Sequence, residues 1–374
     1  MRILVNTRLL IKNRLEGIGW FTLETMKRIT QKRPNDEFIF VSDRKTHSNF
    51  VFADNIQRIK MGWPARRPFL WKLWFENTIP KAIKKCKPDV FLSPDGYLSL
   101  SANVKQLPVI HDINFEHHPE WLPKNYSKYY RKYFPQFAQK AKRVATVSEY
   151  SKQDIAKTYG IDDSNIDVVY NGYNTIYEPL PIEKQQEVRK KISNGKPYIL
   201  FIGSIHPRKN LRNQLKAFDM LNRYYDDKFR LVIVGEAMWN DHLADWVDRR
   251  KKNNIILMGH QPQDKLKEII GSASLLTYIS HFEGFGIPIL EGFAAGVPVI
   301  TSTTTSMPEV AGDAALTVYP DDAAHISNIY KKVLFDEALQ KEMIEKGGAR
   351  LNNFSWDKTA DLLWKSIEKT YHAH

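Results

Sequence analysis

Short apolar runs alternate with amphipathic segments along most of the chain. In the first half, strand-like runs stand at residues 3–6, 37–42, 89–92, 107–110, 144–147 and 167–170, and helical segments at 20–29 and 81–85. The second half repeats the pattern, with strand-like runs at residues 198–202, 230–234, 255–258, 273–279, 297–301 and 315–318. Strands that alternate with helices are typical of doubly wound parallel sheets. We therefore predict an α/β protein with two Rossmann-like domains that face a cleft.

A polar segment at residues 178–196 separates the two halves. We place the domain border there, so that residues 1–178 form the N-terminal domain and residues 179–355 the C-terminal domain. The last segment, about residues 356–374, carries an apolar stripe and is expected to form a core helix.

Composition narrows the class of protein. The 374 residues are 43% hydrophobic, with 18 Gly and 19 Pro, which favours globular domains over disorder. The single cysteine, Cys86, excludes an intramolecular disulfide and a cysteine zinc cluster. No apolar run approaches the roughly 18 residues of a membrane span, and the first residues read as a strand rather than a signal peptide. We expect a cytoplasmic protein.

The net charge of +13 lies almost wholly in the first half. Residues 1–180 hold 29 Lys and Arg against 18 Asp and Glu, a net charge of +11, and the remainder holds 26 against 24, a net charge of +2. A basic half indicates an anionic partner, such as nucleic acid, a membrane surface or an acidic substrate.

One segment of the second half combines two carboxylates with a glycine-rich turn. It reads Ser-His-Phe-Glu-Gly-Phe-Gly-Ile-Pro-Ile-Leu-Glu, in which Glu283 and Glu291 are eight residues apart. Gly284 and Gly286 let the backbone approach a ligand, and the amides near Ile287 open a helix as an anion site. A diphosphate fits this turn, with the carboxylates left to hold hydroxyl groups. The segment therefore predicts a nucleotide-sugar site.

Two other interpretations use the same residues. A surface turn followed by a short core helix would place Glu291 where it complements the helix dipole. A pair of carboxylates also suggests the acid and base of a glycoside hydrolase. The phosphate-type turn between the two glutamates makes the hydrolase the weaker hypothesis.

At this point the segment resembles a known family. Glu283 to Glu291 is similar to the E-x7-E motif of the retaining glycosyltransferases of family 4, whose fold is called GT-B, and residues 296–300 and 306–310 also resemble that family's consensus. The resemblance implies that Glu283 holds a hydroxyl of the donor sugar and Glu291 the ribose hydroxyls. It also implies that the first domain takes the acceptor, that the second takes the donor, and that the last helix crosses back to the first domain.

A loop with two cations follows the strand at residues 198–202. It reads Gly-Ser-Ile-His-Pro-Arg-Lys-Asn from Gly203, and Arg208 and Lys209 suit a diphosphate leaving group whose charge grows as the glycosidic bond breaks. Surface Arg-Lys pairs are common, and the pair alone would favour a solvated turn. Family 4 enzymes carry an Arg and a Lys in this loop, which implies electrostatic catalysis by both residues. The family often has an arginine directly after the first glycine, where this chain has Ser204.

Two segments of the first half also match the family. The turn with Gly17 and Gly19 precedes the helix at residue 20 and resembles the glycine loop that closes over the donor phosphates. His111 and Asp112 end the strand at 107–110, at the sheet edge where doubly wound folds bind ligands. The family has a histidine there that contacts the transferred sugar, which implies this role for His111, with Asp112 as an acceptor-side or orienting group.

The candidate residues form two sets. In addition, Gly235 and Glu236 end a strand of the second half, and their position would let their backbone line the pocket for the base of the nucleotide. The donor-binding candidates are Gly17, Gly19, Gly203, Ser204, Gly259, His260, Gly284, Phe285, Gly286, Ile287 and Glu291. The catalytic candidates are His111, Arg208, Lys209 and Glu283.

No pair of aspartates is spaced to hold a metal with a diphosphate. Asp162 with Asp163, and Asp321 with Asp322, read as polar loop residues. We therefore expect no metal and no other cofactor, with the leaving charge neutralised by the two loop cations and the helix end.

Two segments of the first half mix aromatic and basic residues. Residues 60–87 hold eight basic residues and one acid, and residues 124–143 hold seven basic residues and no acid. Such a mixture suits an anionic leaflet, at about 1 kcal/mol per cation. The alternatives are core aromatics with a solvated cationic face, and nucleic acid. The chain has no signature of an RNA or DNA module, so we expect no nucleic acid, whereas a lipid-linked or otherwise anionic glycan acceptor would explain both segments.

The sequence thus predicts a retaining, metal-independent hexosyltransferase that acts on a polysaccharide or a lipid-linked glycan. Its loops are most similar in wording to those of mannosyltransferases that use GDP-mannose, although a UDP-linked glucose, galactose or N-acetylglucosamine would use the same motifs. A GT-B binding or scaffold protein without activity and a nucleotide-sugar epimerase are the other hypotheses. The expected location is the cytoplasm, with peripheral attachment to the inner face of the membrane left open.

Overall fold

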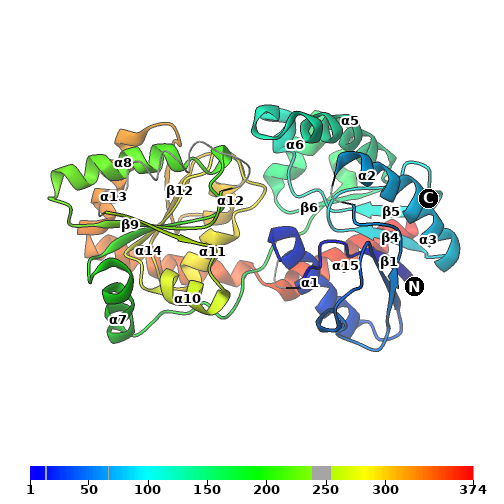
Figure 1. Cartoon of the computed structure of the whole chain (residues 1–374), viewed down its shortest axis with the longest axis horizontal. Helices are drawn as coiled ribbons and strands as arrows, with labels where there is room; N and C mark the ends of the chain where they lie inside the picture. The colour runs from blue at the N-terminus through cyan, green and yellow to red at the C-terminus, as the bar shows by residue number, and fades with distance from the viewer. Residues whose placement is uncertain (13–14, 66, 238–253, 374) are drawn as a thin grey trace. The chain divides into compact units, whose positions relative to one another are not determined.

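A computed structural model describes residues 1–12, 15–65, 67–237 and 254–373. The chain divides into two units, Met1–Gly172 with Ser355–His374, and Tyr173–Phe354. Each unit is a parallel sheet with helices packed on it (Figure 1). The border expected from the sequence lay at residues 178 and 179.

Unit 1 is built on a five-stranded sheet of order β3-β2-β1-β4-β5. Its strands are β1 Arg2–Asn6, β2 Glu37–Ser42, β3 Ile56–Lys60, β4 Val90–Ser93 and β5 Lys105–Pro108. The central strand β1 pairs in parallel with β2 and β4, and its residues Ile3, Leu4 and Val5 are fully buried. A strand buried on both faces needs a continuous apolar run rather than an alternating one, and this is the pattern that the sequence carries.

A second, two-stranded parallel sheet continues unit 1. It consists of β6 Val144–Thr146 and β7 Ile166–Val168, and a single bridge between Val109 and Ala145 joins it to the end of β5. The strand expected at residues 107–110 therefore ends earlier, because Ile110 donates its amide to Ala145 rather than continuing the first sheet.

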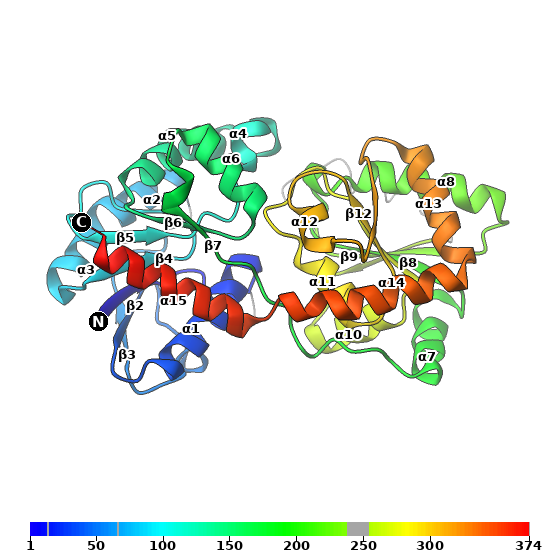
Figure 2. The same cartoon turned by 180° about the vertical axis from the view of Figure 1, so that it is seen from behind.

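The helices of unit 1 include the last one of the chain. They are α1 Gly17–Lys32, α2 Pro68–Leu73, α3 Ile79–Cys86, α4 Asn114–His117, α5 Lys124–Lys140, α6 Glu149–Tyr159 and α15 Trp356–His372, and a π-helical turn, η2 Trp74–Thr78, joins α2 to α3. Helix α15 lies beside α1 (Figure 2), where Arg28 pairs with Asp357 at 3.1 Å and Lys32 with Asp361 at 2.9 Å.

Unit 2 is built on a six-stranded parallel sheet of order β10-β9-β8-β11-β12-β13. Its strands are β8 Tyr198–Ile202, β9 Arg230–Val234, β10 Ile255–Gly259, β11 Leu275–Tyr278, β12 Val299–Ser302 and β13 Leu316–Val318. Its helices are α7 Ile182–Ser193, α8 Leu211–Tyr224, α10 Gln263–Gly271, α11 Ile287–Ala294, α12 Met307–Ala311, α13 Ala323–Phe335 and α14 Glu337–Arg350. Because β8, β9, β10 and β11 are neighbours, the loops that follow them gather at one edge of the sheet.

The apolar runs predicted the buried strands correctly and missed β3. This strand lies at the edge of the sheet, and its sequence Ile-Gln-Arg-Ile-Lys is at most half-buried. An edge strand with three polar residues carries no continuous apolar signal, so its hydrophobic pattern is weak.

Candidate active site

Two loops of unit 2 place one carboxylate between two cations. Glu283 Oε2 lies 2.6 Å from Arg208 Nη1, and Glu283 Oε1 lies 2.6 Å from Lys209 Nζ. Glu283 is only 5% exposed and Lys209 only 8% exposed. The cluster is therefore a buried, charge-assisted network and not the solvated turn that a surface Arg-Lys pair would make.

Glu283 is ionised within this cluster. Burial by itself would raise the pKa of its carboxyl group, but the charges of Arg208 and Lys209 outweigh burial and lower the pKa to about 2. The site therefore holds two positive charges and one negative charge at neutral pH.

The loop after β8 aims the two cations. Gly203 ends the strand, and a Cβ atom on the adjacent Gly235 would lie 1.9 Å from the Gly203 carbonyl oxygen, so only glycine fits at position 235. The loop then forms a single 3-10 turn, η5 Pro207–Lys209, in which the His206 ring accepts a hydrogen bond from the Arg208 amide. The amide of His281 donates to the Arg208 carbonyl at 2.8 Å, which ties this loop to the glutamate loop.

Tyr278, the last residue of β11, is a member of the cluster that the sequence analysis gave no role. Its hydroxyl oxygen accepts a hydrogen bond from Lys209 Nζ at 2.7 Å, and the ammonium lies 4.7 Å from the centre of its ring. The side chain is buried. A tyrosine at a strand end is ordinary in a sheet, so only the pairing of β11 with β8 reveals that it faces Lys209.

The glycine turn is braced from behind by the segment before α12. The hydroxyl of Ser306 donates to the carbonyl oxygens of Glu283 at 2.8 Å and Phe285 at 3.0 Å. The hydroxyl of Thr305 accepts from the Glu283 amide at 3.1 Å, and Thr305 itself has a φ angle of +56°. A β-branched residue in the left-handed region is strained, and such strain persists where the surroundings fix the backbone.

Helix α11 begins directly after this turn. Gly286 has a φ angle of +104° and precedes Ile287, the first helical residue, and Pro288 occupies the first turn, where its missing amide hydrogen costs no helical bond. A Cβ atom on Gly286 would approach Tyr278 to 3.3 Å. The turn thus presents backbone amides at the start of a helix beside the Arg208 and Lys209 loop.

Glu291, on α11, differs electrostatically from Glu283. Burial raises the pKa of its carboxyl group to about 7, and a hydrogen bond with the Tyr177 side chain opposes this rise. The same environment raises the pKa of Tyr177. One motif therefore holds one firmly ionised glutamate and one that titrates near neutral pH.

The loops after β9 and β10 lie next to the cation loop along the sheet edge. Gly235 donates its amide to the Gly259 carbonyl at 2.9 Å, and Ile205 donates to the Glu236 carbonyl at 2.8 Å. Gly259 has a φ angle of +63°, and His260 after it is exposed. These backbones and Ser204 thus belong to the same edge as Glu283.

In unit 1, the two candidate glycines do not lie in a loop before the helix. Helix α1 already begins at Gly17, so both Gly17 and Gly19 belong to its first turn. A Cβ atom on Gly19 would lie 3.1 Å from the Leu9 carbonyl oxygen, whereas one on Gly17 would meet nothing within 4 Å. Gly19 therefore allows close packing of α1 against the preceding chain. The turn expected before residue 20 is instead the first turn of α1, and donor binding by these glycines stays a prediction.

His111 follows β5 and lies partly buried at the carboxyl edge of the unit 1 sheet. Its Nε2 atom lies 2.9 Å from the Pro94 carbonyl oxygen, and its ring meets Phe21 edge-on at 5.0 Å. Burial lowers the pKa of the imidazole, which favours the neutral form. Since a carbonyl can only accept, Nε2 carries the proton and Nδ1 is left as an acceptor.

The neighbours of His111 have local structural roles. The Asp112 carboxylate accepts the Asn114 amide at 3.0 Å and so holds the turn just before α4. Ser148 accepts the Ser151 amide at 3.0 Å and caps α6.

Comparison with known proteins identifies the family. The model named Glycosyltransferase Family 4 matches residues 16–176, and the model named Glycosyl transferases group 1 matches residues 183–350. The chain belongs to glycosyltransferase family 4. It is a hexosyltransferase by this membership, and its fold is GT-B.

Among relatives of this glycosyltransferase is O-antigen chain mannosyltransferase B of Escherichia coli. It is 29% identical over 366 residues, which cover 93% of this chain and 94% of the relative. O-antigen chain mannosyltransferase RfbU of Salmonella typhimurium is 30% identical over 253 residues, which cover 67% of this chain and 64% of the relative. The crystal structure of Anabaena HepE in complex with UDP-glucose matches with a TM-score of 0.77 at 14% identity, over 99% of this chain and 100% of that one. This last likeness shows the fold.

The glycosyltransferase has a second buried charge pair, in unit 1, that sequence reasoning missed. Arg8 Nε lies 2.7 Å from the Asp95 carboxylate, which also accepts from Asn6 at 2.9 Å. The guanidinium carbon lies 4.7 Å from the centre of the Tyr97 ring. Arg8 follows β1 and Asp95 follows β4. Their places after two neighbouring strands were the only sequence signal that the two side chains would meet.

The paired aspartates serve as loop and helix caps. Asp162 accepts the Ser164 amide at 2.8 Å, Asp322 accepts the His325 amide at 2.9 Å, and Asp321 accepts from Asn213 at 3.2 Å. Within the described ranges, no three His, Cys, Asp or Glu side chains gather as metal ligands would.

The structure divides the large apolar side chains of segment 60–87 into a buried and an exposed group. Trp71, Trp74 and Phe75 are core residues, as in the alternative of core aromatics. Three other side chains are exposed, namely Trp63 at 85%, Phe69 at 62% and Leu73 at 50%. Arg66 of this segment lies outside the described residues.

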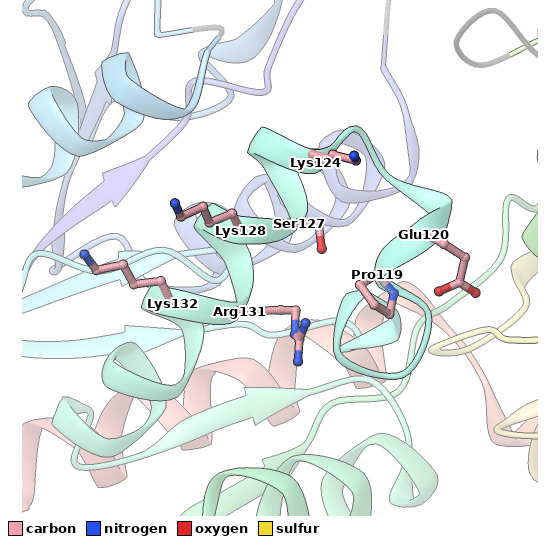
Figure 3. A pocket seen from close by; sticks show the side chains of 7 residues that line it. All are labelled: Pro119, Glu120, Lys124, Ser127, Lys128, Arg131 and Lys132. Carbon is pink, nitrogen blue, oxygen red and sulfur yellow. The ribbon is translucent and has the colours of Figure 1, made fainter.

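Segment 124–143 is largely α5, whose aromatics pack inward and whose cations point outward. Tyr129 and Phe134 are buried in the unit 1 core. On the exposed side, an open hollow of about 530 Å³ is lined by Pro119, Glu120, Lys124, Ser127, Lys128, Arg131 and Lys132. In Figure 3, Lys128 and Lys132 project from one side of α5, away from Glu120. Across the residues that the structure describes, no helix is long and apolar enough to cross a membrane.

Proposed function

We propose that this glycosyltransferase transfers mannose from GDP-mannose to a hydroxyl group of a polysaccharide or a lipid-linked glycan. In this proposal the anomeric configuration of the sugar is retained and no metal ion is needed. The observation that carries the proposal is the Arg208–Glu283–Lys209 cluster beside the glycine turn that opens α11. The mannose specificity is supported by the names of the two bacterial relatives, which are O-antigen chain mannosyltransferases.

In the proposed site, Arg208 and Lys209 bind the diphosphate and neutralise the charge that develops on it as the glycosidic bond breaks. The amides at the start of α11 add to this site. Fixed cations beside a helix end perform the task that a divalent metal performs in other enzymes, and this is the argument for metal independence. Full activity after dialysis against EDTA is the expected result.

The proposed reaction takes a front-face route. The bond between sugar C1 and the diphosphate oxygen breaks, the acceptor oxygen bonds to C1 on the same face, and its proton passes to the leaving phosphate. The family resemblance implies all three side-chain roles: Glu283 holds a hydroxyl of the hexose, Glu291 holds the ribose hydroxyls, and His111 contacts the transferred sugar. The Nδ1 atom of His111 is the one left to accept from a sugar hydroxyl.

The nucleotide and sugar are tested with a donor panel. Purified protein is incubated with GDP-mannose and with UDP-linked glucose, galactose and N-acetylglucosamine, and release of nucleoside diphosphate is measured with a lipid-linked glycan present. Release from GDP-mannose is expected. The UDP donors are the second candidate because HepE, of the same fold, was solved with UDP-glucose. Release of nucleoside diphosphate without acceptor would favour a hydrolase, and consumption of the donor without such release would favour an epimerase. Binding of the donor without any turnover would favour an inactive binding protein.

The proposal includes peripheral contact with an anionic membrane through unit 1. Trp63, Phe69 and Leu73 are exposed on and before α2, and α2 packs beside α5, which carries the lysines of Figure 3. Exposed apolar groups beside cations are the elements of an interfacial site. Co-sedimentation with vesicles that contain phosphatidylglycerol should fall with salt and fall further when Phe69 and Leu73 are replaced by serine. Equal binding to neutral vesicles would contradict the proposed contact with an anionic membrane.

A further inference from the structure

The two cations of the candidate site are already occupied by the protein's own anion. Arg208 Nη1 contacts Glu283 Oε2, and Lys209 Nζ contacts Glu283 Oε1, both at 2.6 Å. The same donor atoms also contact two neutral groups, the Phe282 carbonyl oxygen at 3.1 Å from Arg208 and the Tyr278 hydroxyl at 2.7 Å from Lys209. Glu283 is thus the anionic partner that the two cations share.

A diphosphate bound to the same cations would have to share them with this carboxylate. With Glu283 in place, the cluster has a net charge of +1, from two cations and one anion. Without the carboxylate, the net charge would be +2. Because the cluster is buried, its charges interact more strongly than they would in water, and a carboxylate beside a diphosphate is repelled.

We propose, resting on the proposed function, that Glu283 competes with the diphosphate for Arg208 and Lys209, and that the sugar of the donor decides the competition. When the intact donor binds, a hydroxyl of the hexose donates to Glu283 and replaces the contacts that the carboxylate gives up. After transfer the hexose leaves on the acceptor. Glu283 then loses its hydroxyl partner, returns to the two cations and promotes release of the nucleoside diphosphate.

Glu283 in this scheme selects the donor against the product. A buried carboxylate that has lost its partners is costly, so the donor complex is favoured only while the sugar hydroxyl is present. The braces from Thr305 and Ser306 hold the Glu283 backbone, which confines the exchange to the side chain.

Calorimetry with GDP and with GDP-mannose, without acceptor, tests the proposal on the full-length protein. In Glu283→Gln the amide cannot match the charge of the carboxylate, so GDP should bind about tenfold more tightly than in the wild type. GDP-mannose should gain less, because the variant weakens the contact with the sugar. The preference for donor over product should therefore shrink.

The outcomes separate the inference from the proposed function. If the wild type binds GDP and Glu283→Gln binds it equally or more weakly, the exchange is wrong and the donor site stands. If GDP does not bind and Glu283→Gln binds UDP about tenfold more tightly than the wild type does, the exchange stands with the other nucleotide. If the wild type binds neither nucleotide, the proposed donor site itself fails.

A matched control and a second readout guard against a folding artefact. Glu291→Gln removes the other carboxylate of the motif, and should not tighten GDP binding. Glu283→Gln leaves two cations short of a partner and should lower the Tm, and added inorganic pyrophosphate should raise the Tm more in this variant than in the wild type. Should Glu283→Gln fail to fold, Glu283→Asp keeps the charge but shortens the reach, and should tighten GDP binding to a smaller degree. No tightening in Glu283→Asp would then overturn the proposal.

Discussion

The Tyr278 hydroxyl accepts a hydrogen bond from Lys209 Nζ at 2.7 Å, at the point where β11 passes beside the loop after β8. This contact fixes one of the three ammonium hydrogens, and Glu283 fixes a second. A lysine has four rotatable bonds and makes a poor electrostatic catalyst unless its position is held. Tyr278 is therefore a positioning residue for Lys209.

Tyr278→Phe should lower kcat by about tenfold, the cost of one lost hydrogen bond to a charged group, with a smaller effect on the KM for the donor. Tyr330→Phe is a matched control, because it removes an equally buried tyrosine hydroxyl bond, to Thr277 at 2.7 Å, from the same sheet. Both variants should lose similar stability in denaturant titrations, and only Tyr278→Phe should lose kcat. Equal loss of kcat in both would show that the hydroxyl matters for stability alone.

The pH dependence of donor binding should follow Glu291. Burial raises the pKa of its carboxyl group from 4.5 to about 7, so the carboxylate that we propose accepts ribose hydroxyls forms only as the pH rises through 7. The KM for the donor should therefore fall between pH 6 and pH 8. In Tyr177→Phe the inflection should move to higher pH, because the Tyr177 hydrogen bond opposes the rise in pKa. In Glu291→Gln the KM for the donor should not change with pH over this range. If the variant shows the same pH dependence of KM as the wild type, Glu291 is not the titrating group.

The same group should affect stability with the opposite sign. The pKa of an unfolded glutamate is near 4.5, so the unfolded state loses its proton first as the pH rises, and the contribution of Glu291 to stability falls between about pH 4.5 and pH 7. At pH 8, Glu291→Gln should raise the free energy of unfolding by on the order of 2 kcal/mol, and at pH 4 it should change little. Urea titrations of the ligand-free protein at both pH values measure this. A larger gain at pH 4 than at pH 8 would show that the assigned shift is in the wrong direction.

The contact between Gly235 and Gly203 makes a prediction about stability alone. In Gly235→Ala the Cβ atom would lie 1.9 Å from the Gly203 carbonyl oxygen, so the two strand-end loops must move apart. A loss of about 3 kcal/mol is expected from this clash and the φ angle of +143°. Gly195→Ala is the control, because Gly195 also has a positive φ angle, of +78°, with nothing within 4 Å of its Cβ position. Thermal unfolding should show a loss of about 1 kcal/mol for the control, and equal losses would mean that steric contact is not the cause.

The sequence predicted the core of both units well because their strands are buried on both faces. Continuous apolar runs such as those of β1 and β8 leave no ambiguity about the sheet, whereas the half-exposed edge strand β3 carries no such run. The start of α1 at Gly17 was missed because glycine has low intrinsic helix propensity, and only its packing in the fold shows that it is helical there.

The candidate site could be predicted in outline for a topological reason. Loops after neighbouring parallel strands meet at one sheet edge. If β8 and β11 are neighbours, as they are in the structure, the loop with Arg208 and the loop with Glu283 must therefore lie close together. The individual contacts could not be predicted. The bond between Lys209 and Tyr278 and the pairing of Glu291 with Tyr177 depend on side-chain directions, and a tyrosine in a strand or a linker has no distinctive sequence signal.

The central claim is that Arg208, Lys209 and Glu283 form the donor site of a mannosyltransferase. The most direct measurement compares release of GDP from GDP-mannose, with a glycan acceptor present, by the wild type and by Arg208→Ala, Lys209→Ala and Glu283→Ala, each checked for a folded far-UV circular dichroism spectrum. We expect kcat to fall by about a hundredfold or more in each folded variant. Wild-type rates in all three folded variants would contradict the claim.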